Sequence, residues 1–217
     1  MPDGVDGRTA VALILDWVTA YQLLHRAAHV TAGQKIFVHA LSGAVGGALL
    51  RLGQLLGAQV FGTASLKRHD ELRQLGAVPF DYSTKNWIAA IRELGGVDAV
   101  FDPLGFESFD ESYSVLKKGG VLVGYGMNLP AWTRTPERPV IPSALKLLSK
   151  NLLFWSGKRT TFFGVNRGSK NFAPDLEQLF EWLKEGKILV PVKATFKLDE
   201  IQQAHREYAS GARMGSL

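Results

Sequence analysis

The residues best suited to chemistry in this chain are the glycines Gly43, Gly46 and Gly47, which follow directly on the apolar stretch 36–38. That stretch, Ile-Phe-Val, is short and partly β-branched, as expected of a central parallel strand. Beyond the glycine turn, apolar residues fall at helical spacing, at Val45, Leu49, Leu52 and Leu56. A helix that begins on glycine presents free N–H groups and the positive end of its dipole to the strand's carboxyl edge. The stretch therefore predicts a phosphate-binding turn.

The spacing of this turn is A-x-x-G-x-x-G, counted from Ala40. In such a turn Gly43 lets the backbone approach a pyrophosphate, and Gly46 lets the helix pack tightly on the strand. The same glycines would also serve a tight strand-to-helix turn that binds no ligand. The motif alone does not decide between these two interpretations.

A second determinant of a dinucleotide site lies about 20 residues further on, at the end of the next strand. An acidic residue there would hold a ribose 2′-hydroxyl and select NAD, but this chain has Thr63-Ala64-Ser65. Lys67 and Arg68 follow, and a hydroxyl with two cations suits a 2′-phosphate. Cations are unfavourable at a helix N-terminus, which favours a bound anion over a merely solvated helical turn. The expected cofactor is NADP.

Two further strand ends carry glycine, at 102–105 and at 124–126. The carboxyl ends of the strands form the ligand crevice of a doubly wound sheet. Main-chain groups there would hold a ribose and the nicotinamide amide, although ordinary turn punctuation explains the glycines equally well. Asp102 would either contact the ribose side of the cofactor or cap its own turn. We interpret His39, at the end of the first strand, as a hydrogen-bonded structural histidine.

Two other pairs of residues are weaker candidates for chemistry. Tyr113 and Lys117 have the Y-x-x-x-K spacing in which a lysine lowers the pKa of a tyrosine acid, but they end a predicted helix just before Gly119. His25 and His29 lie one helical turn apart, as metal ligands do, without a third ligand. We interpret the histidines as an exposed helix face and expect no metal.

The elements that must position these residues alternate along the chain. Extended segments are predicted at 36–38, 59–63, 78–80, 97–102, 121–123 and 152–155. Helices are predicted at 9–28, 45–56, 67–75, 86–94, 106–116, 143–153, 174–183 and 198–209, with loops at 128–142 and 157–168. Strands that alternate with helices indicate βαβ units. Their right-handed crossovers require an α/β fold, a doubly wound parallel sheet with helices on both faces.

Composition excludes several classes of protein. The chain has 217 residues, of which 46% are hydrophobic, so it is globular rather than disordered. It contains no cysteine, which excludes disulfides and thiolate metal sites. The net charge of +5 suits an anionic ligand, but a basic stretch of the kind that binds nucleic acid is missing. The apolar stretches are shorter than a membrane span. We expect a soluble protein with neither nucleic-acid nor membrane partners.

Several of these stretches carry a resemblance to a known family. The sequences VHALSGAVGGALL, GTASLKRHDELRQLGA, FDPLG and GGVLVGYG are together similar to the cofactor domain of the medium-chain dehydrogenase/reductase superfamily, and most of all to its zinc-free quinone oxidoreductases. The segments LDWVTAYQLLHRAAHVTAGQKIFVHA and VPVKATFKLDEIQQAHREYASG resemble that family's linker helix and C-terminal return. The resemblance implies a Rossmann-type fold.

The resemblance also implies a division of the chain. Residues 1–30 would form an N-terminal tail and the linker helix, and residues 31–193 the dinucleotide-binding domain. Residues 194–217 would form a C-terminal return segment that is truncated. Members of the family carry an N-terminal barrel-like catalytic domain that forms half of the active site, and we expect that domain to be absent from this chain.

A set of cofactor contacts follows from the same resemblance. The pyrophosphate would lie on the backbone N–H groups of Ala44 and Val45, and the 2′-phosphate on Ser65, Lys67 or Arg68. Tyr82 would lie near the adenine-side phosphate, and the loop at 162–163 beside the nicotinamide. The residues expected to bind the cofactor are Ser42, Gly43, Ala44, Val45, Gly46, Ser65, Lys67, Arg68, Tyr82, Leu104, Gly105, Gly124, Gly126, Phe162 and Phe163.

The activity implied is NADPH-dependent reduction of a small molecule, a quinone or an activated alkene or carbonyl. No catalytic residue is assigned. The family resemblance further suggests a cytoplasmic homodimer that associates through an edge strand near 152–155. The alternative is a module that binds NADPH or a partner without turnover. A methyltransferase-type nucleotide binder would need an acid at the end of the second strand, where Thr63-Ala64-Ser65 supplies none.

Overall fold

The computed structural model describes residues 5–192 and 194–209 and contains one six-stranded sheet. The order of the strands is β3-β2-β1-β4-β5-β6, and every neighbouring pair is parallel. The strands are β1 (Lys35–Val38), β2 (Gln59–Ala64), β3 (Val78–Asp81), β4 (Val97–Asp102), β5 (Leu116–Gly124) and β6 (Arg159–Phe162). The order in which strands are added reverses between β1 and β4, since β2 and β3 lie on one side of β1 and β4 to β6 on the other. That crevice is therefore the ligand-binding point of a doubly wound sheet. The predicted α/β doubly wound, Rossmann-type architecture is confirmed.

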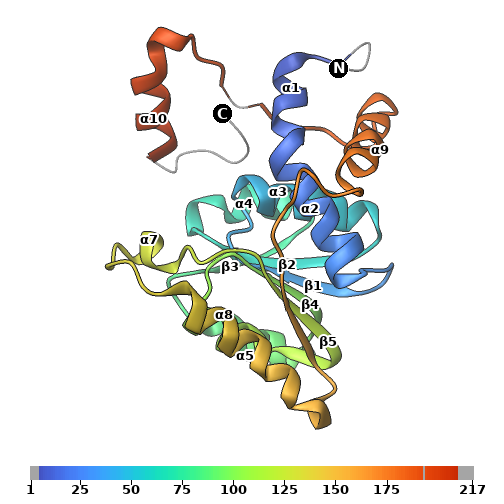
Figure 1. Ribbon diagram of the computed structural model, residues 1–217, viewed down its shortest axis with the longest axis vertical. Helices are drawn as coiled ribbons and strands as arrows, with labels where there is room; N and C mark the ends of the chain where they lie inside the picture. Colours follow the sequence, from blue (N-terminus) through green and yellow to red (C-terminus); the bar gives the residue numbers. More distant parts are fainter. Residues whose placement is uncertain (1–4, 193, 210–217) are drawn as a thin grey trace.

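Helices cover both faces of the sheet (Figure 1). Alternation along β1 explains how: Ile36 and Val38 belong to one core cluster, whereas Phe37 between them belongs to the other. The first cluster includes residues of α2 (Val18–Gln22), α3, α4 and α9, and the second residues of α5, α6 and α8. The helices from α3 on are α3 (Ala44–Leu55), α4 (His69–Gln74), α5 (Asn86–Glu93), α6 (Glu107–Ser114), α7 (Leu129–Thr133), α8 (Val140–Ser149), α9 (Phe172–Lys184) and α10 (Ile201–Ala209).

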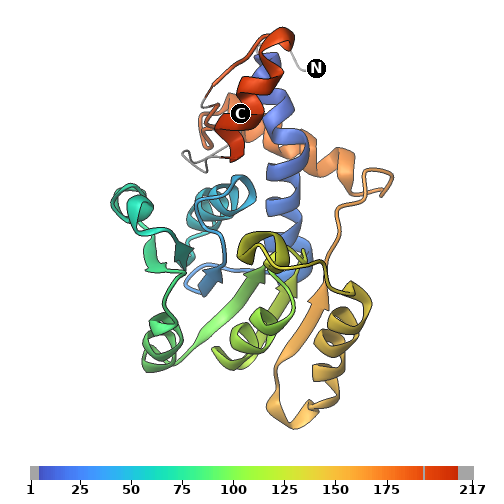
Figure 2. The same cartoon turned by 90° about the vertical axis from the view of Figure 1, so that its left-hand side faces the viewer.

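The predicted helix at 9–28 is confirmed, but it is not uniformly α-helical. It consists of α1 (Gly7–Ala12), a π-helical stretch (Leu13–Trp17), α2 (Val18–Gln22) and a second π-helical stretch (Leu23–Ala28). The Asp6 side chain accepts a hydrogen bond from Thr9 N and caps its start, and His29 in a left-handed conformation ends it. Residues 13–28 of this helix pack on α3, while α1 lies with α9 and α10 beyond the sheet (Figures 1 and 2).

The sixth strand was misplaced by the sequence pattern. The predicted strand at 152–155 is instead two 3₁₀ turns (Lys150–Leu152 and Phe154–Ser156), and β6 lies within the predicted loop at 157–168. The reason is that three of the four residues of β6 are polar, in the sequence Arg-Thr-Thr-Phe, and Thr160 is its one buried residue. The apolar residues that suggested a strand, Leu152, Phe154 and Trp155, are exposed.

Two smaller predictions were also wrong. The helix predicted at 106–116 ends at Ser114, because β5 begins at Leu116, which pairs with Val97. The glycines at 119–120 therefore lie inside β5, next to a register irregularity, and not in the turn before it. The predicted loop at 128–142 contains the short helix α7, with a proline in its first turn, and the start of α8.

Candidate functional site

The glycine turn ends on an uncapped helix. Gly43 is the N-cap of the 12-residue helix α3, in extended conformation and with no side chain to cap the helix. The first backbone N–H groups of α3, those of Ala44, Val45 and Gly46, have no intrahelical acceptor. Because α3 follows the carboxyl end of β1, these groups lie at that edge of the sheet, where β1 is next to β4. The positive end of the helix dipole therefore faces a place where an anion can bind.

Close packing explains two features of this turn. A Cβ on Gly46 would lie 2.2 Å from the carbonyl oxygen of Ala40, so no other residue fits there without movement. Ala40 itself has φ 56°, in the left-handed region that glycine adopts most easily. Leu41 is fully buried and packs against Gly62 of β2, so the bulky residue points into the core and not into the crevice. Ser42, between Leu41 and Gly43 in the sequence, is half-buried.

The predicted 2′-phosphate residues lie together after β2. Ser65 is the N-cap of a 3₁₀ turn (Leu66–Arg68), and its hydroxyl does not cap that turn. The Arg68 side chain is only 15% exposed and donates from Nη1 to Glu71 Oε2 over 3.2 Å. Its Nη2 is buried and has no hydrogen-bond partner among the described residues. A buried donor without an acceptor costs about 1–3 kcal/mol, so this guanidinium is suited to an anion.

The loops that leave β4 and β5 are bound to each other. Leu129 N donates to Leu104 O over 2.9 Å, and Asn128 N donates to Pro103 O over 3.0 Å. A Cβ on Gly126 would lie 2.5 Å from Pro103 O, so this glycine allows the two loops to approach. Gly105 has φ +77° and would otherwise collide with the side chain of Met127. The two loops form one rigid wall of the crevice.

Gly124 has a different environment from its neighbours. A Cβ there would lie 2.7 Å from the Phe109 ring and 2.9 Å from the Leu147 side chain. Its side is therefore filled by α6 and α8, and only its main chain is available to a ligand. Gly124 O accepts a hydrogen bond of 2.7 Å from Phe163 N, which places Phe162 and Phe163 beside the end of β5. Phe162 is 41% exposed.

A cavity of about 310 Å³ opens on the α5 and α6 side of this edge. Tyr82, which directly follows β3, forms one wall, and its ring meets the Trp132 ring edge-on at 6.1 Å between centroids. The other residues lining the cavity are His39, Thr63, Lys85, Trp87, Leu104, Glu107, Ser108, Glu111, Leu129 and Thr133. Aromatic walls over a polar floor suit a planar heterocycle that carries polar groups.

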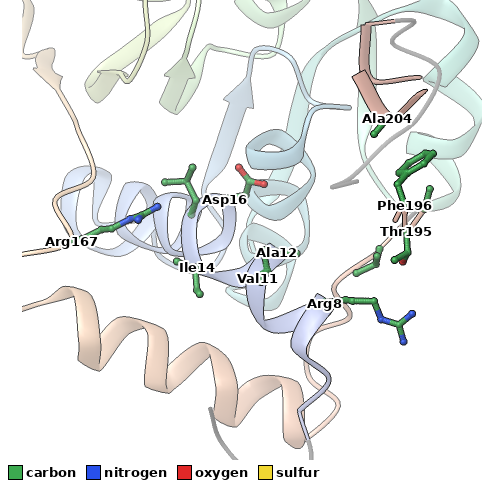
Figure 3. A pocket seen from close by; sticks show the side chains of 12 residues that line it. Arg8, Val11, Ala12, Ile14, Asp16, Arg167, Thr195, Phe196 and Ala204 are labelled. Carbon is green, nitrogen blue, oxygen red and sulfur yellow. The ribbon is translucent and has the colours of Figure 1, made fainter. Parts of the chain in front are cut away.

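A larger pocket of about 780 Å³ lies between the N-terminal helix and the return segment (Figure 3). Its lining is mostly apolar and includes Val11 and Leu15, both of which are exposed. Arg8, Asp16 and Arg167 are its charged residues. Figure 3 shows Asp16 and Arg167 at one end of the pocket, away from Phe196 and Ala204.

The structure brings the predicted cofactor residues to one edge, because each follows or ends a strand of a sheet whose strands are all parallel. It does not bring together the two weaker pairs. Tyr113 hydrogen-bonds Ser156, while Lys117 forms an ion pair with Asp98. His25 packs on the rings of Tyr21 and Trp182. Within the described residues, no three His, Asp or Glu side chains gather as a metal site.

Sequence reasoning missed two features of this edge. The first is the aromatic wall at Trp132, which lay in a predicted loop. The second is a buried chain of polar side chains that joins Thr63, His39, Ser112 and Asp102. Burial lowers the pKa of His39, which keeps its imidazole neutral. The sequence does contain a sign of this network, since His39, Thr63 and Asp102 are polar residues at the ends of three apolar strands.

Comparison with known proteins places the chain. Residues 75–217 match the family model described as "Zinc-binding dehydrogenase". The chain belongs to this zinc-binding dehydrogenase family, within the medium-chain dehydrogenase/reductase superfamily and its quinone oxidoreductase branch. The resemblance seen in the sequence is thereby confirmed.

Individual relatives agree with this placement. A synaptic vesicle membrane protein VAT-1 homolog of Danio rerio is 27% identical over all of this chain, which spans 47% of that relative. A probable quinone oxidoreductase of Schizosaccharomyces pombe is 29% identical over 97% of the chain, which spans 62% of it. The chain thus spans about half of the first and less than two thirds of the second.

Solved structures share the fold. The mycobacterial protein Rv1454c, solved in complex with NADPH, has a TM-score of 0.80 and 28% identity, covering all of this chain and 67% of that one. The Escherichia coli quinone oxidoreductase, also solved with NADPH, has the same TM-score at 22% identity and shares the fold alone. In the described part of this chain, no helix is both long and apolar enough to span a bilayer.

Proposed function

We propose that this chain is the NADP(H)-binding part of an oxidoreductase that reduces a quinone or an activated alkene or carbonyl. The observation that carries the proposal is the buried Nη2 of Arg68, which has no acceptor among the residues that the structure describes. Arg68 lies three residues after Ser65, whose side chain makes no capping hydrogen bond to the turn. No carboxylate ends β2 to select the 2′-hydroxyl of NAD. Relatives solved with NADPH support the same cofactor.

The proposed placement of the cofactor follows the edge of the sheet. The N–H groups of Ala44 and Val45 hold the pyrophosphate, and Ser65, Lys67 and Arg68 hold the 2′-phosphate. The cavity beside Tyr82 and Leu104 takes the adenine end. The main chain at 124–126 and the rings at 162–163 flank the nicotinamide. The bound cofactor supplies the hydride, and this chain orients it and excludes water from its phosphate end.

The first prediction compares NADPH with NADH. We expect the unmodified chain to bind NADPH at least about tenfold more tightly than NADH, because a charge-assisted contact contributes about 1.5–3 kcal/mol. Arg68→Gln removes most of that preference and leaves NADH affinity unchanged. Isothermal titration calorimetry measures both affinities.

The matched control for this prediction is Arg73→Gln. Arg73 lies five residues further along, is 58% exposed, and pairs with Asp70 at the surface. Its loss should leave both affinities unchanged. Equal binding of the two nucleotides by the unmodified chain, or equal effects of the two substitutions, would contradict the 2′-phosphate assignment.

The substrate side is proposed from the family. A zinc-independent reduction needs a second half of the active site, and the apolar pocket of Figure 3, beside the N-terminal helix, is the surface we propose for it. NADPH oxidation assayed with a quinone in the full-length protein separates this enzyme from the alternative, a module that binds NADPH without turnover. Binding without oxidation would favour the module.

A homodimer is the second prediction. Leu152, Phe154 and Trp155 are exposed by 74%, 82% and 69% and lie beside the edge strand β6. Exposed apolar residues of this size indicate a buried contact in an assembly. We expect light scattering after gel filtration to give twice the chain mass, and Trp155→Asp to give the monomer. Leu189→Asp, at a residue 73% exposed elsewhere, is the control and should stay dimeric.

A further inference from the structure

A buried chain of polar side chains links three strand ends beneath the proposed cofactor site. Thr63 Oγ1 lies 3.1 Å from His39 Nδ1, and His39 Nε2 lies 3.0 Å from Ser112 Oγ. Ser112 Oγ in turn donates to Asp102 Oδ2 over 2.7 Å. These four residues are at most 3% exposed. They come from the ends of β2, β1 and β4 and from α6.

The directions of these hydrogen bonds are fixed by chemistry. A carboxylate only accepts, so the Ser112 hydroxyl gives its proton to Asp102 and must accept from His39 Nε2–H. The neutral imidazole then has its lone pair on Nδ1, which accepts the Thr63 hydroxyl proton. The order of donation therefore runs from Thr63 to Asp102 without a conflict, and each member is satisfied.

Asp102, at one end of this hydrogen-bond network, holds the loop after β4 in shape. Asp102 Oδ1 accepts from Leu104 N over 2.7 Å and from Gly105 N over 3.3 Å. Ser108 adds a hydrogen bond of 2.7 Å to Oδ2. Asp102 alone would suffice to cap this turn. The extra link through Ser112 and His39 ties the turn to the strand ends that precede the glycine turn and Ser65.

The other end of the hydrogen-bond network, at Thr63, faces the cavity. His39, Thr63 and Ser108 all line the cavity of about 310 Å³ that also contacts Leu104 and Tyr82. Thr63 lies two residues before Ser65, and its main-chain oxygen accepts from Leu41 N over 2.9 Å. Two of the four residues of the network, His39 and Thr63, thus form part of the floor of the cavity, which a purely internal packing network would not do.

We propose that Thr63, His39 and Ser112 are positioning residues, which act through Asp102 to hold the loops after β1, β2 and β4 in the arrangement that binds the cofactor. The inference rests on the proposed NADP(H) function. It assigns to these residues an effect on nucleotide affinity that exceeds their effect on folding. Fully satisfied buried networks are rigid, so breaking one link should loosen all three loops.

A matched pair of threonines tests this proposal. Thr63→Val and Thr160→Val each remove one buried hydroxyl from the same sheet, and the Thr160 hydroxyl donates to Leu147 O, outside the network. We expect both variants to lower the midpoint of thermal unfolding by similar amounts. Thr63→Val should weaken NADPH binding about tenfold, as expected for a lost buried hydrogen bond, and Thr160→Val should not. Thr63→Ser should restore the affinity.

A second variant keeps the test decisive if Thr63→Val does not fold. Ser112→Ala cuts the link between His39 and Asp102 while leaving the Ser108 bond, and we expect the same loss of affinity. If the unmodified chain binds NADPH and neither Thr63→Val nor Ser112→Ala weakens binding, the inference is overturned while the proposed function stands. If the unmodified chain does not bind NADPH, both are overturned. Equal losses in Thr63→Val and Thr160→Val would reduce the network to a structural role and also overturn the inference.

Discussion

Replacing Gly46 by alanine should abolish tight nucleotide binding and lower the free energy of unfolding by about 2–3 kcal/mol, at the upper end of what overpacking costs. A Cβ at this position would lie 2.2 Å from Ala40 O and 2.9 Å from two backbone atoms of Leu41. None of these atoms belongs to a flexible side chain. The helix α3 must therefore move away from the turn, and its first N–H groups move with it.

The same helix contains the control. Gly53 of α3 is also buried, but a Cβ there would meet the ends of the Ile36 and Val60 side chains, at 2.9 and 3.3 Å. Those atoms can shift, and alanine gains about 1 kcal/mol in helix propensity over glycine. Gly53→Ala should therefore change stability by less than about 1 kcal/mol and leave NADPH affinity unchanged. Calorimetry and urea unfolding measure both quantities. A Gly46→Ala variant with unmodified affinity would show that the turn does not hold the pyrophosphate.

Local pattern was sufficient for most of the sheet. Five of the six strands were predicted within a few residues, because the buried strands of a parallel sheet are short apolar stretches bounded by glycine. The sixth was not, because β6 (159–162) has the sequence Arg-Thr-Thr-Phe, with one apolar residue, and so resembles a loop, whereas the other edge strand, β3, has Val, Pro and Phe. Conversely, Leu152, Phe154 and Trp155 read as a strand although their side chains are exposed. Apolar character predicts burial, and the prediction fails where apolar side chains lie on the surface, as these three do.

The candidate site divides along similar lines. The glycine turn and Ser65-x-Lys67-Arg68 were identifiable because backbone geometry and charge leave a mark within a few residues. The unpaired Nη2 of Arg68 was not, because pairing depends on what surrounds a side chain in space. The hydrogen bonds of His39 reach Thr63 and Ser112, 24 and 73 residues away. Contacts of that separation depend on the topology of the sheet and cannot be obtained from spacing.

The second large effect that we expect is a loss of stability when Asp175 is replaced, because its side chain joins segments that are still further apart in the sequence. Asp175 of α9 is 2% exposed and accepts hydrogen bonds from Gln22 at 2.7 Å and from Arg26 at 2.8 and 2.5 Å. It joins the N-terminal helix to α9 across about 150 residues of sequence, by a bidentate pair of the strongest common kind. These helices contact each other beside the sheet, so the pair holds the N-terminal helix in place.

We expect Asp175→Ala to lower the free energy of unfolding by about 2–3 kcal/mol, below the full cost of breaking a buried pair because Arg26 is 40% exposed and can be hydrated. Gln22, which is buried, is left without its acceptor. The thermal midpoint should fall by about 5–10 °C for a chain of this size. Glu181→Ala removes a surface pair with Lys184 on the same helix and should change the midpoint by less than about 2 °C. Equal midpoints for the two variants would mean that α9 is not fastened to the N-terminal helix by Asp175. Because Arg26 lies in a pocket with Gly157, Lys158 and Arg159, at the amino end of β6, Asp175→Ala should leave NADPH affinity unchanged at temperatures where the chain is folded, unlike Gly46→Ala.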